Sequence, residues 1–332
     1  MDLIERLQGQ VPEPISPAAY AKEILKINSQ GLLHCLSTVL QQEVQRYNNL
    51  LNEITGSLSN LHDAVLGKIN MSAVLDAMHT DLMKNRVPSN WSAVSYPSLK
   101  PLASWMTDLA ARVQFMRNWA VRGHPACFWL AGFFFPHGFI TGVLQTYARK
   151  HQRPIDLLHW QFEVLSHMDS STLPKAPADG VYIYGLFIEN ARWNADHRCL
   201  EEPGPGEMFA HIPVIHFMPK YVPPQNAKEE ETKAGLKLKR ATQEEEEEKE
   251  IYKCPVYKTS ARAGVLSTTG QSTNFILTVD LPCGVPDTEE NKARRAAGLE
   301  LSEQSADSGI IQHMSAEFWT LRGAAMLTML DS

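Results

Sequence analysis

The sequence has no excess of basic residues, because its 332 residues carry 31 Lys and Arg against 37 Asp and Glu, a formal net charge of −6. Nucleic-acid binding rests largely on neutralising phosphates, so this balance, together with the lack of any Lys/Arg cluster interleaved with aromatics, argues against a nucleic-acid partner. A run of about eighteen apolar residues is also missing, and we expect no transmembrane helix and no membrane partner. The segment Met1-Asp-Leu-Ile-Glu-Arg has neither the apolar core of a signal peptide nor the composition of a transit peptide.

Cysteine is scarce. The five cysteines are odd in number, widely spaced and without a CxxC pair, which is typical of reduced thiols in a cytosol. The sequence contains no GxxxxGK[ST] motif, no GxGxxG between a strand and a helix, and no GxSxG. The nearest phosphate-binding candidate, the Gly/Ser/Thr-rich segment 264–274, has no Lys and no following helical pattern. We predict a tight hairpin connection there.

Candidate metal ligands and acid/base groups are few. His124 and Cys127 form an HxxC pair near His137, but no second pair follows at zinc-finger spacing, so buried or capping histidines are expected. Cys127 lies in an aromatic run, where burial would raise its pKa and make it inert. Four carboxylates that nothing places across one cleft are read as solvated loop residues: Glu189, Asp196, Glu201 and Glu202. The sequence thus predicts no catalytic, metal or cofactor site and favours a docking or structural module.

The first half of the chain has helical patterns. An apolar stripe from Leu36 to Ile69 predicts one long helix, with Glu43 on the polar face toward water or a polar partner. A shorter helix is expected over 72–84. Residues 1–30 carry too few apolar residues to form a core alone, so we expect them to be the end of a larger unit that docks elsewhere.

A loop and a third helix follow. Proline and Ser/Asn residues predict an extended loop over 88–101, held in place by Trp91 and Tyr96. The next apolar stripe starts after Pro101 and predicts a helix that ends at Gly123.

The densest aromatic cluster lies at 126–150 and divides the sequence in two. The run from Phe128 to Phe135 is too short for a membrane span and too apolar for water, so a buried strand is expected, ended by Pro136. From His137 onward the apolar spacing is helical. We predict a strand that leads into a helix, at the joint of two halves.

The second half reads as short strands separated by Gly/Pro/Ser turns, which indicates an antiparallel sandwich or barrel. The expected strands cover 157–165, 181–188, 212–218, 252–257, 275–281 and 318–330. Pro213 and Pro255 each remove a hydrogen-bond donor, so their strands should lie at an edge or carry a bulge. Two charged stretches, 225–250 and 287–307, are expected to be weakly ordered insertions. The Glu run in the first is read as a solvated linker, with an acidic recognition segment as the alternative.

Several segments together resemble the C-terminal region of dynein heavy chains, from about residue 35 to the end. They are 39–48, 90–105, 132–136, 141–150, 184–193, 254–259, 262–274 and the closing Trp319-Thr-Leu-Arg-Gly323. The forms Phe-Phe-Phe-Pro136 and Tyr96-Pro-Ser-Leu-Lys-Pro101 are similar to the axonemal branch of the family. The insertions at 225–250 and 287–307 depart from the family by lengthening two loops.

The resemblance implies an α+β domain, a helical part followed by an incomplete antiparallel β-barrel. Residues 1–34 would end the preceding sixth AAA+ module, 35–150 form the helical part and 151–332 the barrel. The family's domain lies across one face of the motor ring and hydrolyses nothing. The implied partners are the AAA+ ring modules of the same heavy chain and, indirectly, other dynein subunits and microtubules. The implied function is to modulate ATP-driven, minus-end-directed microtubule motility in the axoneme of a cilium or flagellum.

Four residues of the helical part are expected at the interface with the ring: Trp91, Tyr96, Trp105 and Arg112. Phe133 to Phe135 are expected in the core instead. A free-standing adaptor that binds another axonemal component through its acidic loop is the alternative function. An enzyme is the third possibility, and it would need a deep polar cleft lined by Glu189, Arg192 and Asp196.

Overall fold

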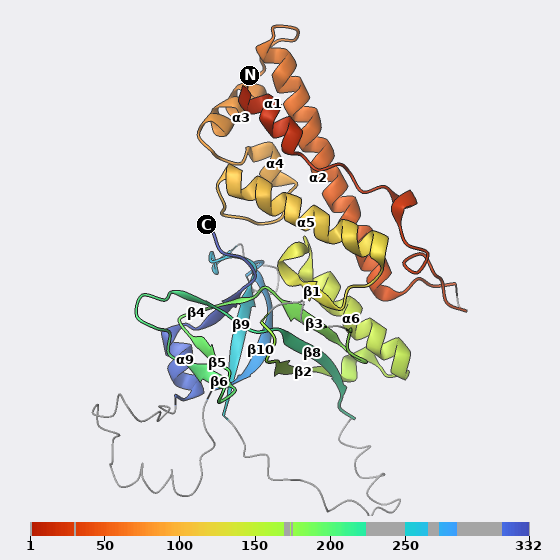
Figure 1. Cartoon of the computed structure of the whole chain (residues 1–332), viewed down its shortest axis with the longest axis vertical. Coiled ribbons are helices and arrows are strands. Elements are labelled where there is room, and N and C mark those ends of the chain that lie inside the picture. Colours follow the sequence, from red (N-terminus) through yellow and green to blue (C-terminus); the bar gives the residue numbers. More distant parts are fainter. Residues whose placement is uncertain are drawn as a thin grey trace, which may run out of the picture.

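The computed structural model describes residues 2–29, 31–168, 173, 175–223, 250–264, 272–283 and 314–331. The molecule is elongated, with the helical part at one end and the sheets at the other (Figure 1). The two predicted insertions lie outside the described residues apart from Glu250, as does most of the segment 264–274 predicted to be a hairpin connection. Those predictions stay predictions.

In the described residues, six α-helices lie before strand β2 (Leu158–Val164) in the sequence. They are α1 (Asp2–Gln10), α2 (Cys35–Val65), α3 (Ala73–Met83), α4 (Ser89–Ala93), α5 (Leu102–Arg122) and α6 (Pro136–His151). The long helix α2 is confirmed, although it ends at Val65 and leaves Ile69 42% exposed. Helix α5 ends as predicted at Gly123, whose φ of 91° favours glycine.

Two helical details differ from the prediction. The segment 88–101 is not wholly extended, because α4 forms over Ser89–Ala93 and carries the buried Trp91. Glu43, expected to face water or a polar partner, is 1% exposed. Glu43 lies three residues after Leu40 and four before Tyr47, both on the buried stripe, so it shares their face of the helix.

The predicted joint, a strand that leads into a helix, is confirmed, but its strand is short. Strand β1 covers only Cys127–Trp129, and a 3-10 turn over Leu130–Gly132 follows it. Helix α6 begins at Pro136, in the first-turn position that tolerates a missing N–H. The turn leads the aromatic run away from the sheet and across to α2 and α5.

The remaining strands and the last helix are β2 (Leu158–Val164), β3 (Val181–Tyr184), β4 (Phe187–Glu189), β5 (Arg192–Asn194), β6 (Cys199–Glu201), β7 (Phe209–His211), β8 (Ile215–Tyr221), β9 (Ile251–Tyr257), β10 (Phe275–Pro282), α9 (Ala316–Arg322) and β11 (Ala325–Leu327). One sheet has the order β1-β3-β8-β2 and a second the order β10-β9-β11-β4-β7, while β5 and β6 pair separately.

The described strands form a mixed, mainly antiparallel arrangement that does not close into a barrel. Two pairs are parallel, β1 with β3 and β11 with β9. The outer strands β2 and β10 contact each other, but no ladder joins them. The predicted fold class, a helical part followed by an incomplete barrel, is therefore confirmed, and the parallel pairs are the departure from it.

Two predicted strands were wrong in their limits. The run 181–188 is split at Gly185, whose φ is 74°, so that β3 and β4 belong to different sheets. The segment 318–330, expected as a strand, begins inside α9. Ser315 caps that helix by accepting from the N–H of Phe318, and Gly323 ends it with a φ of 69°.

The two proline predictions also differ from the structure. Pro213 precedes β8 instead of lying in it. Pro255 lies in β9, which is flanked by β10 and β11 and is not an edge strand. Its partner β10 carries an irregularity between Phe275 and Leu277, beside Val256.

Candidate interaction sites

Asp108 and Arg112 form a buried ion pair on α5. Their Oδ2 and Nε atoms are 2.5 Å apart, and the side chains are 8% and 2% exposed. The guanidinium also donates to the carbonyl of Ala131, which joins α5 to the joint. Burial alone would lower the pKa of Arg112, but Tyr47, Tyr96 and Asp108 outweigh it, and the pKa is raised. Arg112 therefore stays charged inside the protein.

Three aromatic side chains extend this centre toward α4. The guanidinium carbon of Arg112 lies 3.9 Å from the centre of the Tyr96 ring, a cation–π distance. Tyr96 stacks on Trp105 at 6.0 Å, and Trp105 stacks on Trp91 at 5.9 Å. The indole of Trp91 donates to Ser57 Oγ of α2 at 2.8 Å. The stack thereby fixes the 88–101 segment between α2 and α5.

Glu43 and Tyr47 attach α2 to the same joint. The carboxylate of Glu43 accepts from the backbone N–H groups of Phe134 at 2.6 Å and Phe135 at 3.2 Å. Tyr47 donates its hydroxyl to the carbonyl of Gly132 at 2.7 Å. Burial raises the pKa of Glu43, although those N–H groups and Arg46 oppose the shift. Side chains of α2 thus satisfy the backbone of the Gly-Phe-Phe-Phe segment. We call the groups around Arg112 and Glu43 the helical centre.

The structure brings together all four residues predicted at the ring interface, but it places them in the interior. Trp91, Tyr96, Trp105 and Arg112 are between 0% and 3% exposed. Their side chains therefore lie beneath the surface of the helical part. The predicted role at the ring interface stays a prediction. Among the three phenylalanines expected in the core, Phe133 is buried, Phe134 is half-buried and Phe135 is 47% exposed. The core prediction was wrong for Phe135, because the backbone turns outward before α6.

A second arginine centre lies in the sheets. Arg262 pairs with Glu189 of β4 and donates to the carbonyl of Gly323 at 2.8 Å. Tyr252 donates to the neighbouring carbonyl of Ala324 at 2.6 Å. Three of the segments that carried the family resemblance, 184–193, 262–274 and 319–323, meet at this sheet centre. No sequence pattern indicated their contact, because it depends on β11, which follows Gly323 and inserts between β4 and β9.

The acidic residues considered for catalysis are mostly paired with basic ones. Glu201 pairs with Arg192 at 2.5 Å, and Glu202 pairs with Arg322. Glu189 belongs to the sheet centre, while Asp196 is exposed. The enzyme hypothesis required a cleft lined by Glu189, Arg192 and Asp196, and the first two are engaged in different ion pairs. Glu189 and Glu201 therefore act as structural partners, whereas Asp196 and Glu202 are exposed outside the strands, as we expected.

The remaining candidates for chemistry are also held in the fold. Burial raises the pKa of Cys127 to about 12, as the aromatic run implied. His124 accepts at Nδ1 from the indole of Trp119 at 3.0 Å. In the described ranges, no three His, Cys, Asp or Glu residues are grouped so that they could hold a metal ion. No described helix combines the length and apolar character that crossing a membrane requires.

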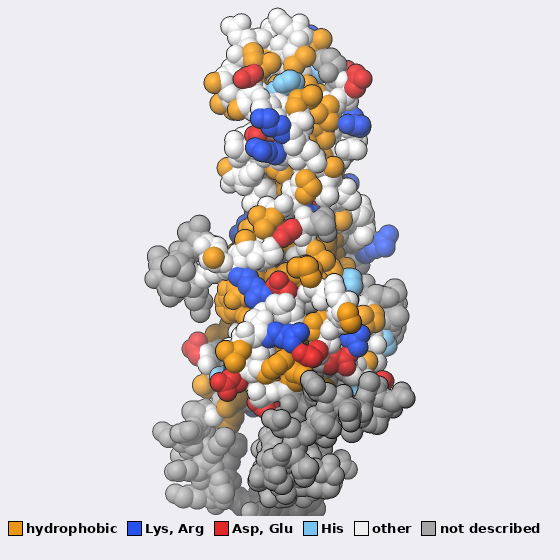
Figure 2. All heavy atoms as spheres, turned by 90° about the vertical axis from the view of Figure 1, so that its left-hand side faces the viewer, with side chains coloured by type: hydrophobic (Ala, Val, Ile, Leu, Met, Phe, Trp, Pro, Cys, Tyr) orange, Lys and Arg blue, Asp and Glu red, His pale blue; other side chains and the backbone are white. Residues whose placement is uncertain are grey.

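The free end of the helical part exposes a set of large apolar side chains. They lie at the end of α2, in the following turn and on α3: Val65, Leu66, Ile69, Met71, Val74 and Met83, with exposed fractions from 39% to 66%. Figure 2 shows apolar side chains at this end of the molecule, mixed with polar ones. We call this set the apolar tip. Such a concentration of exposed apolar groups is typical of a contact surface.

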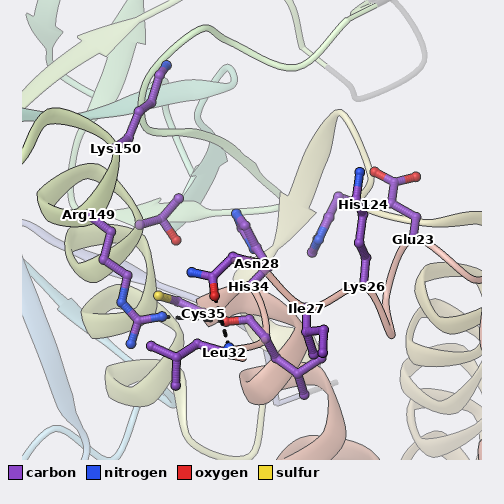
Figure 3. Close-up of a pocket in the computed structure, with 12 residues that line it drawn as sticks. Glu23, Lys26, Ile27, Asn28, Leu32, His34, Cys35, His124, Arg149 and Lys150 are labelled. Atoms are coloured by element: carbon purple, nitrogen blue, oxygen red, sulfur yellow. Dashed lines mark hydrogen bonds between the residues drawn. The ribbon is translucent and has the colours of Figure 1, made fainter. Parts of the chain in front are cut away.

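A cavity of about 620 Å³ lies where the segment 23–35 meets α6. Figure 3 shows His34 and His124 side by side in it, with Glu23 and Lys26 nearby and Arg149 on α6. The two imidazole rings are 4.8 Å apart. The volume is in the range of small-molecule sites, which sequence reasoning missed because its residues come from three separate segments.

The fold is that of an α+β domain in which one arginine centre joins α5 to the joint and the other joins β4 to the end of α9. Residues 1–328 match the family model for the C-terminal domain of the dynein heavy chain, and the protein belongs to this family. It is 39% identical over 300 residues to human dynein axonemal heavy chain 6, covering 85% of this sequence and 7% of the relative. It is 41% identical over 287 residues to rat dynein axonemal heavy chain 1, covering 86% of this sequence and 6% of the relative.

Rat dynein axonemal heavy chain 12 is 38% identical over 296 residues, covering 89% of this sequence and 8% of the relative. The protein thus spans a small fraction of the length of these relatives. The resemblance to the axonemal branch is confirmed. The proposed boundary at residue 34 stays a prediction.

Proposed function

We propose that this protein is the C-terminal cap of an axonemal dynein heavy chain, that it packs on the AAA+ ring, and that it modulates ATP-driven, minus-end-directed microtubule motility. Its location would be the axoneme of a cilium or flagellum. The observation that carries the proposal is the match of nearly the whole sequence to the family, with axonemal heavy chains among its relatives. Catalysis is assigned to modules elsewhere in the heavy chain.

The construction of the domain supports a role in transmitting force or position. The helical centre joins α2 and α5 to the joint through hydrogen bonds, and the joint begins with β1 of the four-stranded sheet, so a displacement of the helical part would be passed on to that sheet. The sheet centre attaches α9 and β11 to β4. These cross-links between elements would help a cap to keep its structure while the ring changes conformation.

The apolar tip is the surface we assign to the ring contact. It carries the most exposed apolar side chains of the helical part, Val74 and Met83, both at 66%. Burial of such side chains drives association, since each contributes about 1.5–3 kcal/mol when fully removed from water. The four buried residues Trp91, Tyr96, Trp105 and Arg112 would act at this interface indirectly, by fixing the helices that present it.

Residues 1–34 dock on the helical part by their own contacts. Asn48 of α2 bonds both backbone groups of Ile15 at 2.9 Å. Ile4, Leu7, Ile15 and Ile24 are buried against the helices. We propose that this segment continues the ring into the cap, with the helical part at 35–150 and the sheet part at 151–332 following.

The test is cross-linking mass spectrometry on the intact heavy chain, comparing the natural protein with the double variant Val74→Glu/Met83→Glu. We expect cross-links between the tip and the ring in the natural protein and their loss in the variant, with ATP turnover retained. The double variant Met208→Glu/Leu321→Glu, at side chains 66% and 82% exposed in the sheet part, is the matched control. A tip without cross-links to the ring would refute the surface assignment.

A second measurement addresses catalysis by the domain alone. The purified 332-residue protein should not turn over ATP. Clear turnover that survives further purification would contradict the proposed function.

A further inference from the structure

The cavity between segment 23–35, His124 and α6 has unused hydrogen-bond donors at its floor. His34 caps α2 by accepting at Nδ1 from the N–H of Leu36 at 3.3 Å. His124 accepts at Nδ1 from the indole N–H of Trp119 at 3.0 Å. Each neutral ring must therefore carry its proton on Nε2. Neither Nε2 has a hydrogen-bond partner among the described residues, so two N–H donors remain available within one cavity.

The charges around the cavity favour an anion. Lys26, Arg149 and Lys150 line it, against the one carboxylate of Glu23. Lys150 is already engaged by Asp179 at 2.7 Å. Among the described residues, the guanidinium of Arg149 makes only a long bond, 3.4 Å from its Nη1 to the carbonyl of Leu33, and the ammonium group of Lys26 has no partner. The lining therefore carries more positive than negative charge around the two imidazole N–H groups, which can donate to an oxyanion.

The walls of the cavity are apolar. Ile27 and Leu32 line it and are 58% and 45% exposed, and Leu33 and Cys35 complete that side. The volume of about 620 Å³ exceeds the space that a bare inorganic ion fills. A ligand with an anionic head and an apolar or planar body would use both the charged and the apolar parts.

We propose that this cavity binds a small organic phosphate, with its phosphate at the two imidazole N–H groups and its apolar body against Ile27 and Leu32. The inference is independent of the proposed packing on the ring. It assigns a ligand site to a domain whose described residues show no catalytic arrangement.

The imidazoles give the site a pH dependence. Burial, then Arg149, lower the pKa of His34 while Glu23 opposes them, and burial and His34 lower the pKa of His124 to about 4. The charged or titratable groups on the neighbouring elements are Glu23 and Lys26 on the segment, Cys35 on α2, Tyr147, Arg149 and Lys150 on α6, and Asp179 beyond Lys150. A bound dianion adds negative charge beside both rings and raises their pKa values. By linkage, the anion then binds more tightly as the pH falls.

The test titrates the 332-residue protein with phenyl phosphate and with inorganic phosphate at about pH 7, where both imidazoles are neutral in the free protein. Calorimetry should give a Kd for phenyl phosphate of about 1 mM or lower. Inorganic phosphate should bind several-fold more weakly because it leaves the apolar wall uncovered. Equal affinities, or no saturation by phenyl phosphate, would overturn the proposal.

Variants locate the site. Arg149→Gln/Lys26→Gln should weaken the binding of phenyl phosphate about tenfold or more, because the lining of the cavity loses two positive charges. Lys68→Gln, which removes a charge at the far end of α2, should leave the affinity unchanged. If both variants bind equally well, the anion lies elsewhere and the assignment fails.

The pKa values of the imidazoles, measured by NMR, give a second test whose result cannot be produced by unfolding. Sulfate, whose charge is constant across this pH range, should raise the pKa of His34 and His124 in the natural protein and have little effect on them in Arg149→Gln/Lys26→Gln. Equal shifts in the two proteins would indicate non-specific screening and contradict the proposal.

Discussion

Arg112 in the helical part and Arg262 in the sheet part each bond one carboxylate and one backbone carbonyl, but water reaches them to different extents. The side chains of Arg112 and Asp108 are 2% and 8% exposed, whereas those of Arg262 and Glu189 are 31% and 20% exposed. An unpaired charge costs far more in the first setting than in the second. We therefore expect the bonds of Arg112 to contribute much more to the stability of the fold than the equivalent bonds of Arg262.

The two centres also differ in what they connect. Arg112 acts where one helix meets the 3-10 turn of the joint, a segment with few ladder hydrogen bonds of its own. Arg262 acts next to strands that are already paired on both sides. The helical centre holds together segments that are not joined by strand pairing, while the sheet centre adds side-chain bonds to strands that are already paired.

The largest expected effect is at Arg112. Replacement by Met removes one partner of a buried pair and leaves Asp108 and the Ala131 carbonyl without their donor. We expect a loss of about 3–5 kcal/mol in the free energy of unfolding, measured by urea denaturation. The double variant Asp108→Leu/Arg112→Met should recover part of the loss, because it removes both charges. A single variant as stable as the natural protein would refute the distinction between the two centres.

Acid should destabilise the protein through His124, a partly buried group of the helical part. Its pKa lies near 4 in the folded state, below the ordinary value of 6.5. The unfolded state then binds the proton more readily, so the stabilising effect is complete above about pH 6.5 and is lost as the pH falls toward 4, by roughly 2 kcal/mol. Thermal unfolding of the natural protein and of His124→Gln across this window measures the difference. Identical slopes for the two proteins would show that His124 contributes nothing.

A smaller effect is expected at the sheet centre. Arg262→Gln should cost about 1–2 kcal/mol, because the variant amide can still donate to Gly323 and water can reach Glu189. Urea denaturation under the conditions used for Arg112→Met gives the direct comparison. A cost as large as that of Arg112→Met would show that burial is not the deciding factor.

The smallest effect is expected at Arg322, whose pair with Glu202 is 36% and 45% exposed. Solvent screening limits such a pair to about 0–1 kcal/mol. Arg322→Gln should unfold at nearly the same urea concentration as the natural protein, and any remaining loss should vanish at high salt. A loss that persists at high salt would mean that the cation over the Phe318 ring carries the contribution.

The parts of the fold that could be predicted from the sequence have a regular period or a strong end signal. The apolar stripe of α2, the glycine at the end of α5 and the proline at the start of α6 were all recognised correctly. Helix α9 was missed although Ser315, Glu317 and Gly323 form start and stop signals, because its apolar residues were read as part of a strand. The split at Gly185 and the insertion of β11 depend on contacts between distant segments, which no local pattern encodes.

For the candidate sites, the sequence identified residues but not their surroundings. Trp91, Tyr96, Trp105 and Arg112 do form one cluster, yet aromatic residues on a loop cannot by themselves be assigned to the surface or the interior. Asp108 and Arg112, four residues apart beside Trp105 and Leu109 on α5, were the available sign of a buried ion pair. The apolar tip was hidden because Ile69 was counted as part of a buried stripe.

The most direct test of the cap function is microtubule gliding by the intact axonemal heavy chain and by the same heavy chain ended before residue 35. Retained ATP hydrolysis would show that the ring of the truncated motor is folded. With that control met, we expect a changed gliding velocity and a changed stimulation of ATP turnover by microtubules. A truncated motor that matches the intact one in both quantities would contradict the proposed cap function.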